Sequence, residues 1–172
     1  VGSARLLHLS AKGSSPNGLA NRSGLVGKRL MMHPLARITG LFKDRVGGHK
    51  GLSAGTLVSH QFYETDAKRG FRRGFKMQAL GTHGPALTAT GSMGRQINWG
   101  ISHHKEFERH FGHAYSLSIC SDDMPDPENR VSLSEKIVAD DGLAAAKMTY
   151  KIPAEAQKAL NYGLIKAKMA LQ

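Results

Sequence analysis

Apolar and polar side chains alternate in several stretches of the central part of the chain, and this alternation predicts a β-sheet. A period of two is typical of a strand that packs one face on a core and leaves the other face uncovered. The segments with strand-like patterns are residues 36–42, 56–63, 75–80, 114–120, 130–133 and 147–151. We therefore predict an antiparallel β-sheet of about five or six strands, which is a common size for a sheet.

Helical patterns flank these strands and interrupt them once. From Pro153 onward, apolar residues recur at spacings of three and four, with an acidic residue early and lysines late, as the helix dipole prefers. A short helix is also predicted at the start of the chain, and another that ends near Gly112. The residues that define the three apolar stripes are Ala4, Leu7 and Ala11; Ile101, Phe107 and Phe111; and Ala156, Leu160, Leu164, Ala167 and Leu171. Strands in the middle with helices around them predict an α+β fold.

Length and composition are those of a globular chain. With 172 residues, 40% hydrophobic and 22% charged, the sequence is long enough for one domain with a core, or for part of a larger protein. It contains no run of about 18 apolar residues, so we expect no membrane-spanning helix. The single cysteine, Cys120, lies in the apolar run "YSLSIC", which favours a structural thiol over a nucleophile.

A net charge of +11 suggests a polyanionic partner, and one dense basic cluster could supply the contacts. The cluster is "KRGFRRGFK" at residues 68–76, in which Phe71 and Phe75 alternate with basic residues. Such a segment could neutralise phosphates and stack bases. It could equally be a solvated hairpin whose phenylalanines point inward, and we favour this second interpretation because no known nucleic-acid motif is present. A basic nucleic-acid-binding or interaction module remains the alternative function.

Several other patterns are incomplete as functional sites. The sequence "GLVGKRL" at residues 24–30 lacks the spacing of a phosphate-binding P-loop, since Arg29 occupies the position of the hydroxyl residue. His103, His104, His110 and His113 suggest zinc, but no convergent set of ligands is evident, and we expect no metal site. The acidic stretch "SDDMPDPENR" at 121–130 lacks the order of a calcium-binding EF-hand.

Three segments, taken together, resemble the glucose-methanol-choline (GMC) family of flavin oxidoreductases. "GSARLLHLSA" is similar to the second signature of that family, with Ala4 where proline is common and Ala11 where glycine is common. "SGLVGKRLMMHP" resembles its Val-Gly-x-Asn-Leu-x-x-His-Pro passage, with Arg29 in place of the frequent asparagine. "DMPDPENRVSL", followed by "AKMTYKI", resembles the acidic-proline turn and the two strands that lead back to the flavin domain.

The resemblance implies a segment of an FAD-dependent enzyme that oxidises CH–OH groups of alcohols, sugars or choline-like substrates. It implies three parts: the end of the FAD-binding domain with the crossover at 1–30, a substrate-binding sheet domain at 31–152, and a helix leading back to the FAD-binding domain at 153–172. Lys28 then lies in the crossover. FAD contacts are expected at Gly2, Ser3 and Ala4. The candidates for the substrate-side roof over the flavin are Gln61, Tyr63, Phe75, Met77 and Gln78.

The same resemblance places the dinucleotide fingerprint before residue 1 and the catalytic histidine with its partner after residue 172. We therefore expect no catalytic residue in this segment, no tight FAD binding by this chain alone, and no activity without the rest of the enzyme. The expected partners are the remaining segments of the flavoenzyme, a small alcohol or sugar substrate, and an electron-acceptor protein. Nucleic acid is disfavoured as a partner, and the sequence does not indicate a compartment.

Overall fold

The computed structural model describes residues 1–51, 57–81, 84–91, 97 and 99–172, and its helices and strands make up a mixed fold. In chain order the elements are α1 (Gly2–Leu9), β1 (Leu35–Leu41), β2 (Val58–Ser59), the 3-10 helix η1 (Ala67–Arg69), β3 (Phe75–Leu80), α2 (Pro85–Thr90), α3 (His103–His110), β4 (Ala114–Ser121), β5 (Arg130–Val138), β6 (Ala144–Thr149) and α4 (Ala154–Ala170). The predicted α+β class is confirmed, because these helices accompany strands that all pair in the antiparallel sense.

The strands of the described residues divide into two sheets. One sheet has four strands in the order β1-β4-β3-β2, and the other is the pair β5-β6. The chain forms two compact units: Val1–Met32 with Asp123–Ala154, and His33–Asp122 with Glu155–Gln172. The first unit therefore contains the two-stranded sheet and α1, and the second contains the four-stranded sheet and α4.

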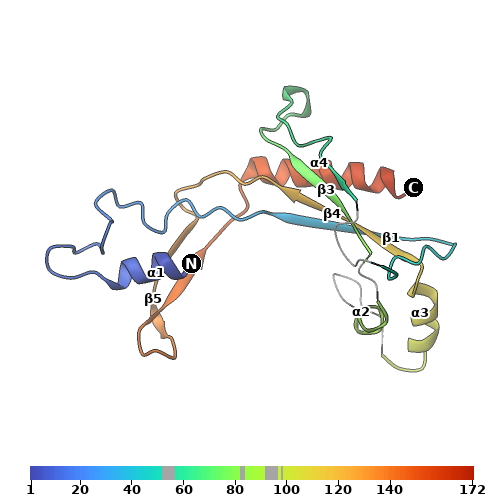
Figure 1. The fold of residues 1–172 in the computed structure, drawn as a ribbon, viewed down its shortest axis with the longest axis horizontal. Coiled ribbons are helices and arrows are strands. Elements are labelled where there is room, and N and C mark those ends of the chain that lie inside the picture. Colours follow the sequence, from blue (N-terminus) through green and yellow to red (C-terminus); the bar gives the residue numbers. More distant parts are fainter. Residues whose placement is uncertain (52–56, 82–83, 92–96, 98) are drawn as a thin grey trace. The chain divides into compact units, whose positions relative to one another are not determined.

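In the second unit, α4 covers one face of the four-stranded sheet (Figure 1). Phe75 of β3 and Ile119 of β4 are buried under the helix, where they pack with Ala159 and Leu160. The strand register explains which residues share this face, because Met77 pairs with Ile119 and Ile119 pairs with Ala36. Directly paired residues project to the same side of a sheet. Every second residue of the three strands therefore projects to the side on which α4 lies, as the alternation in the sequence predicts.

In the first unit, α1 packs against the β5-β6 hairpin. Arg5 fixes the helix to the hairpin, because its guanidinium donates to both carboxylate oxygens of Asp141 at 2.8 Å and its Nε donates to the carbonyl of Ala144 at 2.9 Å. Asn129, which is buried, donates to and accepts from the backbone of Lys151 at 2.9 and 2.7 Å. These bonds hold α1 and both ends of the hairpin within one unit.

The structure corrects several sequence-based expectations. The segment predicted as a strand over 56–63 contains only the two-residue β2, and residues 60–63 form a turn closed by Tyr63 N donating to His60 O; residue 56 lies outside the described residues. Ile101 was assigned to an apolar stripe, but it precedes α3 and is fully exposed. The short helix α2 was not predicted. Within the described ranges, no helix combines the length and the apolar character that a membrane crossing requires.

Candidate functional site

The face of the four-stranded sheet opposite α4 carries mostly polar side chains. Three rows run across β1, β4 and β3 on this face: Leu35, Cys120 and Lys76; Arg37, Ser118 and Gln78; and Thr39, Ser116 and Leu80. We call these residues the polar face. Thr39 and Ser116 share a hydrogen bond of 2.8 Å, with either hydroxyl as the donor. A sheet that is apolar toward its helix and polar on the other side can present hydrogen-bonding groups to a ligand.

Arg37 of the polar face has a buried hydrogen-bond donor that is not satisfied by a described residue. Its Nη1 is buried, and no hydrogen-bond partner for that atom lies among the described residues. Burial also lowers the pKa of the Arg37 guanidinium below its usual range. The residue as a whole is only partly buried, so part of the side chain reaches the surface.

The five residues predicted to contact substrate do not lie on one face. Gln78 belongs to the polar face and is partly exposed. Phe75 is 1% exposed and stacks on Phe62 with ring centroids 5.1 Å apart, so it belongs to the core beneath α4. Met77 also faces α4, where it borders an apolar groove of about 560 Å³. Gln61 and Tyr63 lie in the exposed turn after β2. Substrate contact stays a prediction for all five, and the face that each strand residue occupies favours Gln78 over Phe75 and Met77.

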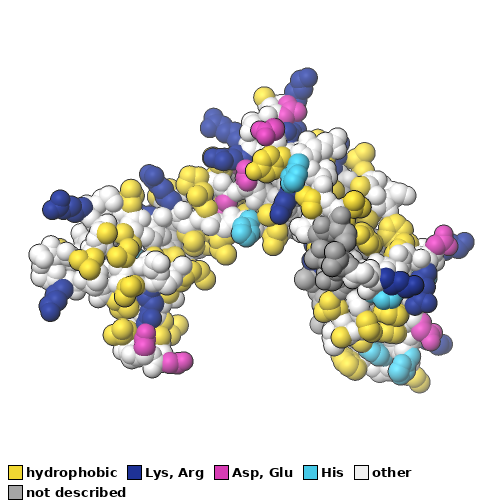
Figure 2. Space-filling model, viewed as in Figure 1, with side chains coloured by type: hydrophobic (Ala, Val, Ile, Leu, Met, Phe, Trp, Pro, Cys, Tyr) yellow, Lys and Arg dark blue, Asp and Glu magenta, His cyan; other side chains and the backbone are white. Residues whose placement is uncertain are grey.

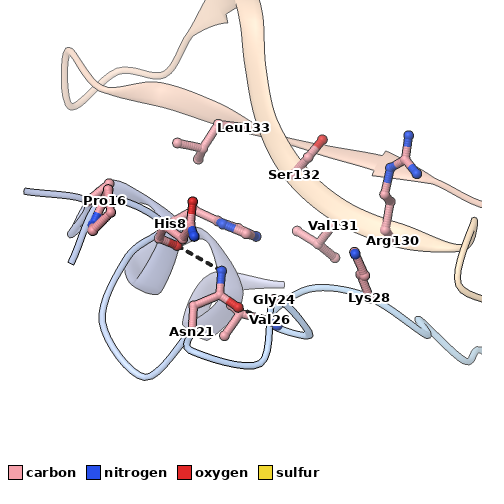
Figure 3. A pocket seen from close by; sticks show the side chains of 12 residues that line it. His8, Pro16, Asn21, Gly24, Val26, Lys28, Arg130, Val131, Ser132 and Leu133 are labelled. Carbon is pink, nitrogen blue, oxygen red and sulfur yellow. Dashed lines mark hydrogen bonds between the residues drawn. The ribbon is translucent and has the colours of Figure 1, made fainter.

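A second concave site, an open pocket of about 490 Å³, lies in the first unit between α1, the following loop and β5 (Figure 3). His8, Asn21, Lys28 and Arg130 line it from three segments. Asn21 organises the loop, since its Nδ2 donates to Asn17 O at 2.8 Å and its Oδ1 accepts from Val26 N at 3.1 Å. His8 Nε2 is buried without a hydrogen-bond partner among the described residues.

Gly27 lies between the lining residues Val26 and Lys28 and has a structural role. Gly27 has a φ of +76°, and its carbonyl accepts a 2.7 Å hydrogen bond from Val131 N of β5. A Cβ atom at this position would lie 2.2 Å from Val131 O, which no side chain could tolerate. The glycine before Lys28 therefore permits a close approach of two backbones, and this agrees with the rejection of a P-loop.

Gly2, Ser3 and Ala4, the predicted FAD contacts, form the first turn of α1. The first backbone hydrogen bond of the helix runs from Arg5 N to Val1 O, so the N–H groups of the three preceding residues have no acceptor within the helix. Gly2 and Ser3 are exposed, and the first turn has no acidic residue. These donors fit an oxygen of a cofactor, although cofactor binding itself stays a prediction.

The basic cluster at 68–76 folds with its phenylalanines inward, as predicted. Phe71 and Phe75 are 5% and 1% exposed and contact Tyr162 of α4, so neither ring can stack on a base. Lysine and arginine side chains gather on the surface of the segment between β2 and β3 (Figure 2). Arg69 is partly buried and donates to Phe62 O at 2.8 Å. The cluster is therefore a solvated surface over a packed hairpin.

The histidines near α3 are not arranged as a metal site. His103 stacks on Trp99 with centroids 4.7 Å apart, His110 Nδ1 lies 2.6 Å from Glu106 O, and His113 Nδ1 lies 3.2 Å from Phe42 O. Among the residues that the structure describes, no three of His, Cys, Asp and Glu lie together as metal ligands.

The surroundings of Cys120 and of the acidic loop at 121–130 indicate structural roles for both. Burial is the main cause that raises the pKa of the Cys120 thiol above its ordinary value, which keeps the sulfur protonated at neutral pH. Asp123 of the acidic loop accepts hydrogen bonds from the Tyr150 hydroxyl at 2.7 Å and from Met32 N at 2.8 Å. Desolvation and this carboxylate raise the pKa of Tyr150. Asp123 therefore connects the segments before β1 and after β6 within the first unit.

The chain is similar to two curated dehydrogenases. It is 42% identical over 167 residues to 2-methyl-1,2-propanediol dehydrogenase of Mycolicibacterium austroafricanum, a match that covers 95% of this chain and 30% of that protein. It is 26% identical over 151 residues to the fructose dehydrogenase large subunit of Gluconobacter japonicus, which covers 86% of this chain and 27% of that protein. The chain thus spans less than a third of either relative. No protein-family model matches it.

Proposed function

We propose that this chain is a segment of a GMC-type, FAD-dependent oxidoreductase that acts on CH–OH groups. The observation that carries the proposal is the similarity to two proteins named as dehydrogenases, one of a diol and one of a sugar, across nearly the whole chain. The first match covers 95% of the chain, so it includes most of both compact units. The three motif resemblances in the sequence point to the same family.

Within such an enzyme, we assign the four-stranded sheet to the substrate side of the flavin, with the polar face toward the reacting groups. The apolar face packs on α4, so the polar face is the one that offers hydrogen-bonding side chains to a substrate. FAD, when bound, accepts a hydride from the carbon that bears the hydroxyl. The side chains of the polar face would orient the substrate and exclude water around it, since hydride transfer requires a short distance and a fixed geometry.

The first turn of α1 is assigned to the cofactor side. The N–H groups of Gly2, Ser3 and Ala4 would donate to an oxygen of the cofactor, as helix N-termini do for anionic groups. The proton acceptor for the substrate hydroxyl is not assigned to any residue of this chain. The segment thus contributes binding and orientation to the reaction.

The experiment is to purify the full-length parent, release and quantify its flavin, and follow dye reduction with a panel of alcohols, diols and sugars. The proposal predicts stoichiometric FAD and flavin-dependent oxidation of at least one CH–OH compound. A parent that binds no flavin, or that holds flavin but oxidises no member of the panel with dye or oxygen, contradicts it.

A further inference from the structure

Three polar side chains form one straight row across the middle of the polar face. Arg37 of β1 pairs with Ser118 of β4, and Ser118 pairs with Gln78 of β3. Residues in direct register project to the same side, and neighbouring strands are about 4.8 Å apart. The next row, Ile38, Leu117 and Ala79, faces α4. Arg37, Ser118 and Gln78 therefore present a guanidinium, a hydroxyl and an amide in sequence along one line.

The hydrogen-bonding capacity of this row is unused by the described part of the chain. Arg37 makes no ion pair with a described carboxylate, and its buried Nη1 has no acceptor there. No described group bonds to the side chains of Ser118 or Gln78 either. A buried donor without an acceptor is costly, and more so when the donor is charged. This cost is offset if a ligand supplies the acceptor.

The charge around the row favours an anionic ligand. Lys76 lies on the same face in the adjacent row and adds a second cation. The acidic side chain closest along the strand is Asp122, which follows β4 and is exposed. A carboxylate suits the partly desolvated guanidinium of Arg37. The planar fork of an arginine can donate two parallel hydrogen bonds to the two oxygens of a carboxylate.

The order of the guanidinium, hydroxyl and amide along the row indicates which chemical groups the ligand carries. A carboxylate held by Arg37 and the Ser118 hydroxyl lies over β1 and β4. The Gln78 amide on β3 can both donate and accept, which suits a hydroxyl group. We infer that the Arg37-Ser118-Gln78 row recognises the carboxylate and a hydroxyl of a hydroxy acid, so that the substrate class is a hydroxylated carboxylate. The inference rests on the proposed function, because that function places this face toward the substrate.

The test compares matched substrates on the full-length parent. Glycerate is compared with glycerol, and gluconate with sorbitol, since each pair differs mainly in the carboxylate. The wild type is expected to show higher kcat/KM for the acid of at least one pair. Arg37→Gln removes the charge but keeps a hydrogen-bonding group, and it is expected to lower the acid-to-polyol ratio by about 10- to 100-fold.

Arg72→Gln serves as the control, because it removes one positive charge from an exposed position outside the polar face. It is expected to leave the acid-to-polyol ratio unchanged. Flavin content and melting temperature are measured for each variant. A wild type that prefers both polyols, an unchanged ratio in Arg37→Gln, or loss of flavin in that variant overturns the inference.

Titration calorimetry with gluconate separates this inference from the proposed function, because it measures binding without turnover. If the parent holds no flavin but binds gluconate in a manner that Arg37→Gln abolishes, the proposed function fails and the binding site stands. If the parent oxidises only polyols and Arg37→Gln changes no gluconate binding, the function stands and the hydroxy-acid site fails.

Discussion

Gly163 of α4 lies directly against Ile119 of β4. A Cβ atom at position 163 would be 2.7 Å from Cγ2 of Ile119 and 3.2 Å from Cε2 of Phe75, so the glycine allows the helix to approach the sheet closely. A glycine inside a helix costs about 1 kcal/mol relative to alanine. The close packing of the helix on the sheet explains why this position accommodates a residue that weakens the helix.

Gly163→Val is expected to destabilise the chain by roughly 1–3 kcal/mol, because the added methyl groups overfill a packed core. Denaturant unfolding followed by circular dichroism measures the change. Asn161→Val places the same side chain on an exposed position of α4 and is expected to change stability by less than about 0.5 kcal/mol. Equal effects of the two substitutions would show that α4 does not pack on Ile119 in this way.

Gly27→Ala is expected to destabilise the first unit more than Gly24→Ala. Both glycines have a positive φ, of +76° and +65°, and so both substitutions incur backbone strain of about 1 kcal/mol or more. A Cβ at Gly24 meets nothing within 4 Å, whereas a Cβ at Gly27 meets Val131 O at 2.2 Å. The difference between their unfolding free energies isolates the contact with β5. If it is zero within error, the loop does not pack against β5.

Asp141→Asn is expected to weaken the first unit at neutral pH and to reduce its sensitivity to acid. The hydrogen bonds from Arg5 are the main cause that lowers the pKa of Asp141 to about 2. A carboxylate with a lowered folded pKa stabilises the fold above its unfolded pKa of about 3.9, and this contribution is lost as the pH falls toward 2.

Melting temperatures measured from pH 7 to pH 2 test this expectation. The wild type should lose more stability than Asp141→Asn between about pH 4 and pH 2. Asp140→Asn is the control, since Asp140 is exposed and makes no ion pair with a described residue. Parallel curves for wild type and Asp141→Asn would contradict the role of the Arg5-Asp141 pair.

Cys120 is expected to react slowly with iodoacetamide at pH 7. Its pKa is raised, mainly by burial, so the reactive thiolate is scarce at neutral pH. Because the thiolate forms only as the pH rises through that pKa, the rate should keep increasing above pH 9. Mass spectrometry of timed samples, with glutathione as the reference thiol, gives the two rates. Labelling at pH 7 as fast as that of glutathione would contradict a shielded thiol.

The sequence predicted most strands because their pattern is local. The alternation in 75–80 and 114–120 reflects one face under α4, and β3 and β4 occupy Phe75–Leu80 and Ala114–Ser121. The short helix α2 was missed, since six residues with two threonines give little helical periodicity. Ile101 was misplaced because an apolar residue near a helix does not have to be buried.

The polar row could be predicted only in part, because its residues are brought together by strand order. Gln78 was identified from its strand, but Arg37 lies 41 residues earlier, and only the order β1-β4-β3 places it in line with Ser118. Phe75 and Gln78 looked equivalent in the sequence. Which of two alternating sets faces the helix depends on tertiary packing, and no local pattern fixes it.

We propose that the polar face of the four-stranded sheet faces the substrate of a flavin-dependent CH–OH oxidoreductase, and one pair of variants tests this most directly. Gln78 and Met77 are neighbours on β3 that project to opposite faces, so Gln78→Leu and Met77→Leu form a matched pair in the full-length parent. Anaerobic mixing with the best substrate, followed through the loss of oxidised-flavin absorbance, measures the step directly. Gln78→Leu is expected to lower the second-order rate of flavin reduction by about 3- to 10-fold with full flavin content, whereas Met77→Leu is expected to leave it unchanged. An unchanged rate in Gln78→Leu, or an equal loss in both variants, would contradict it.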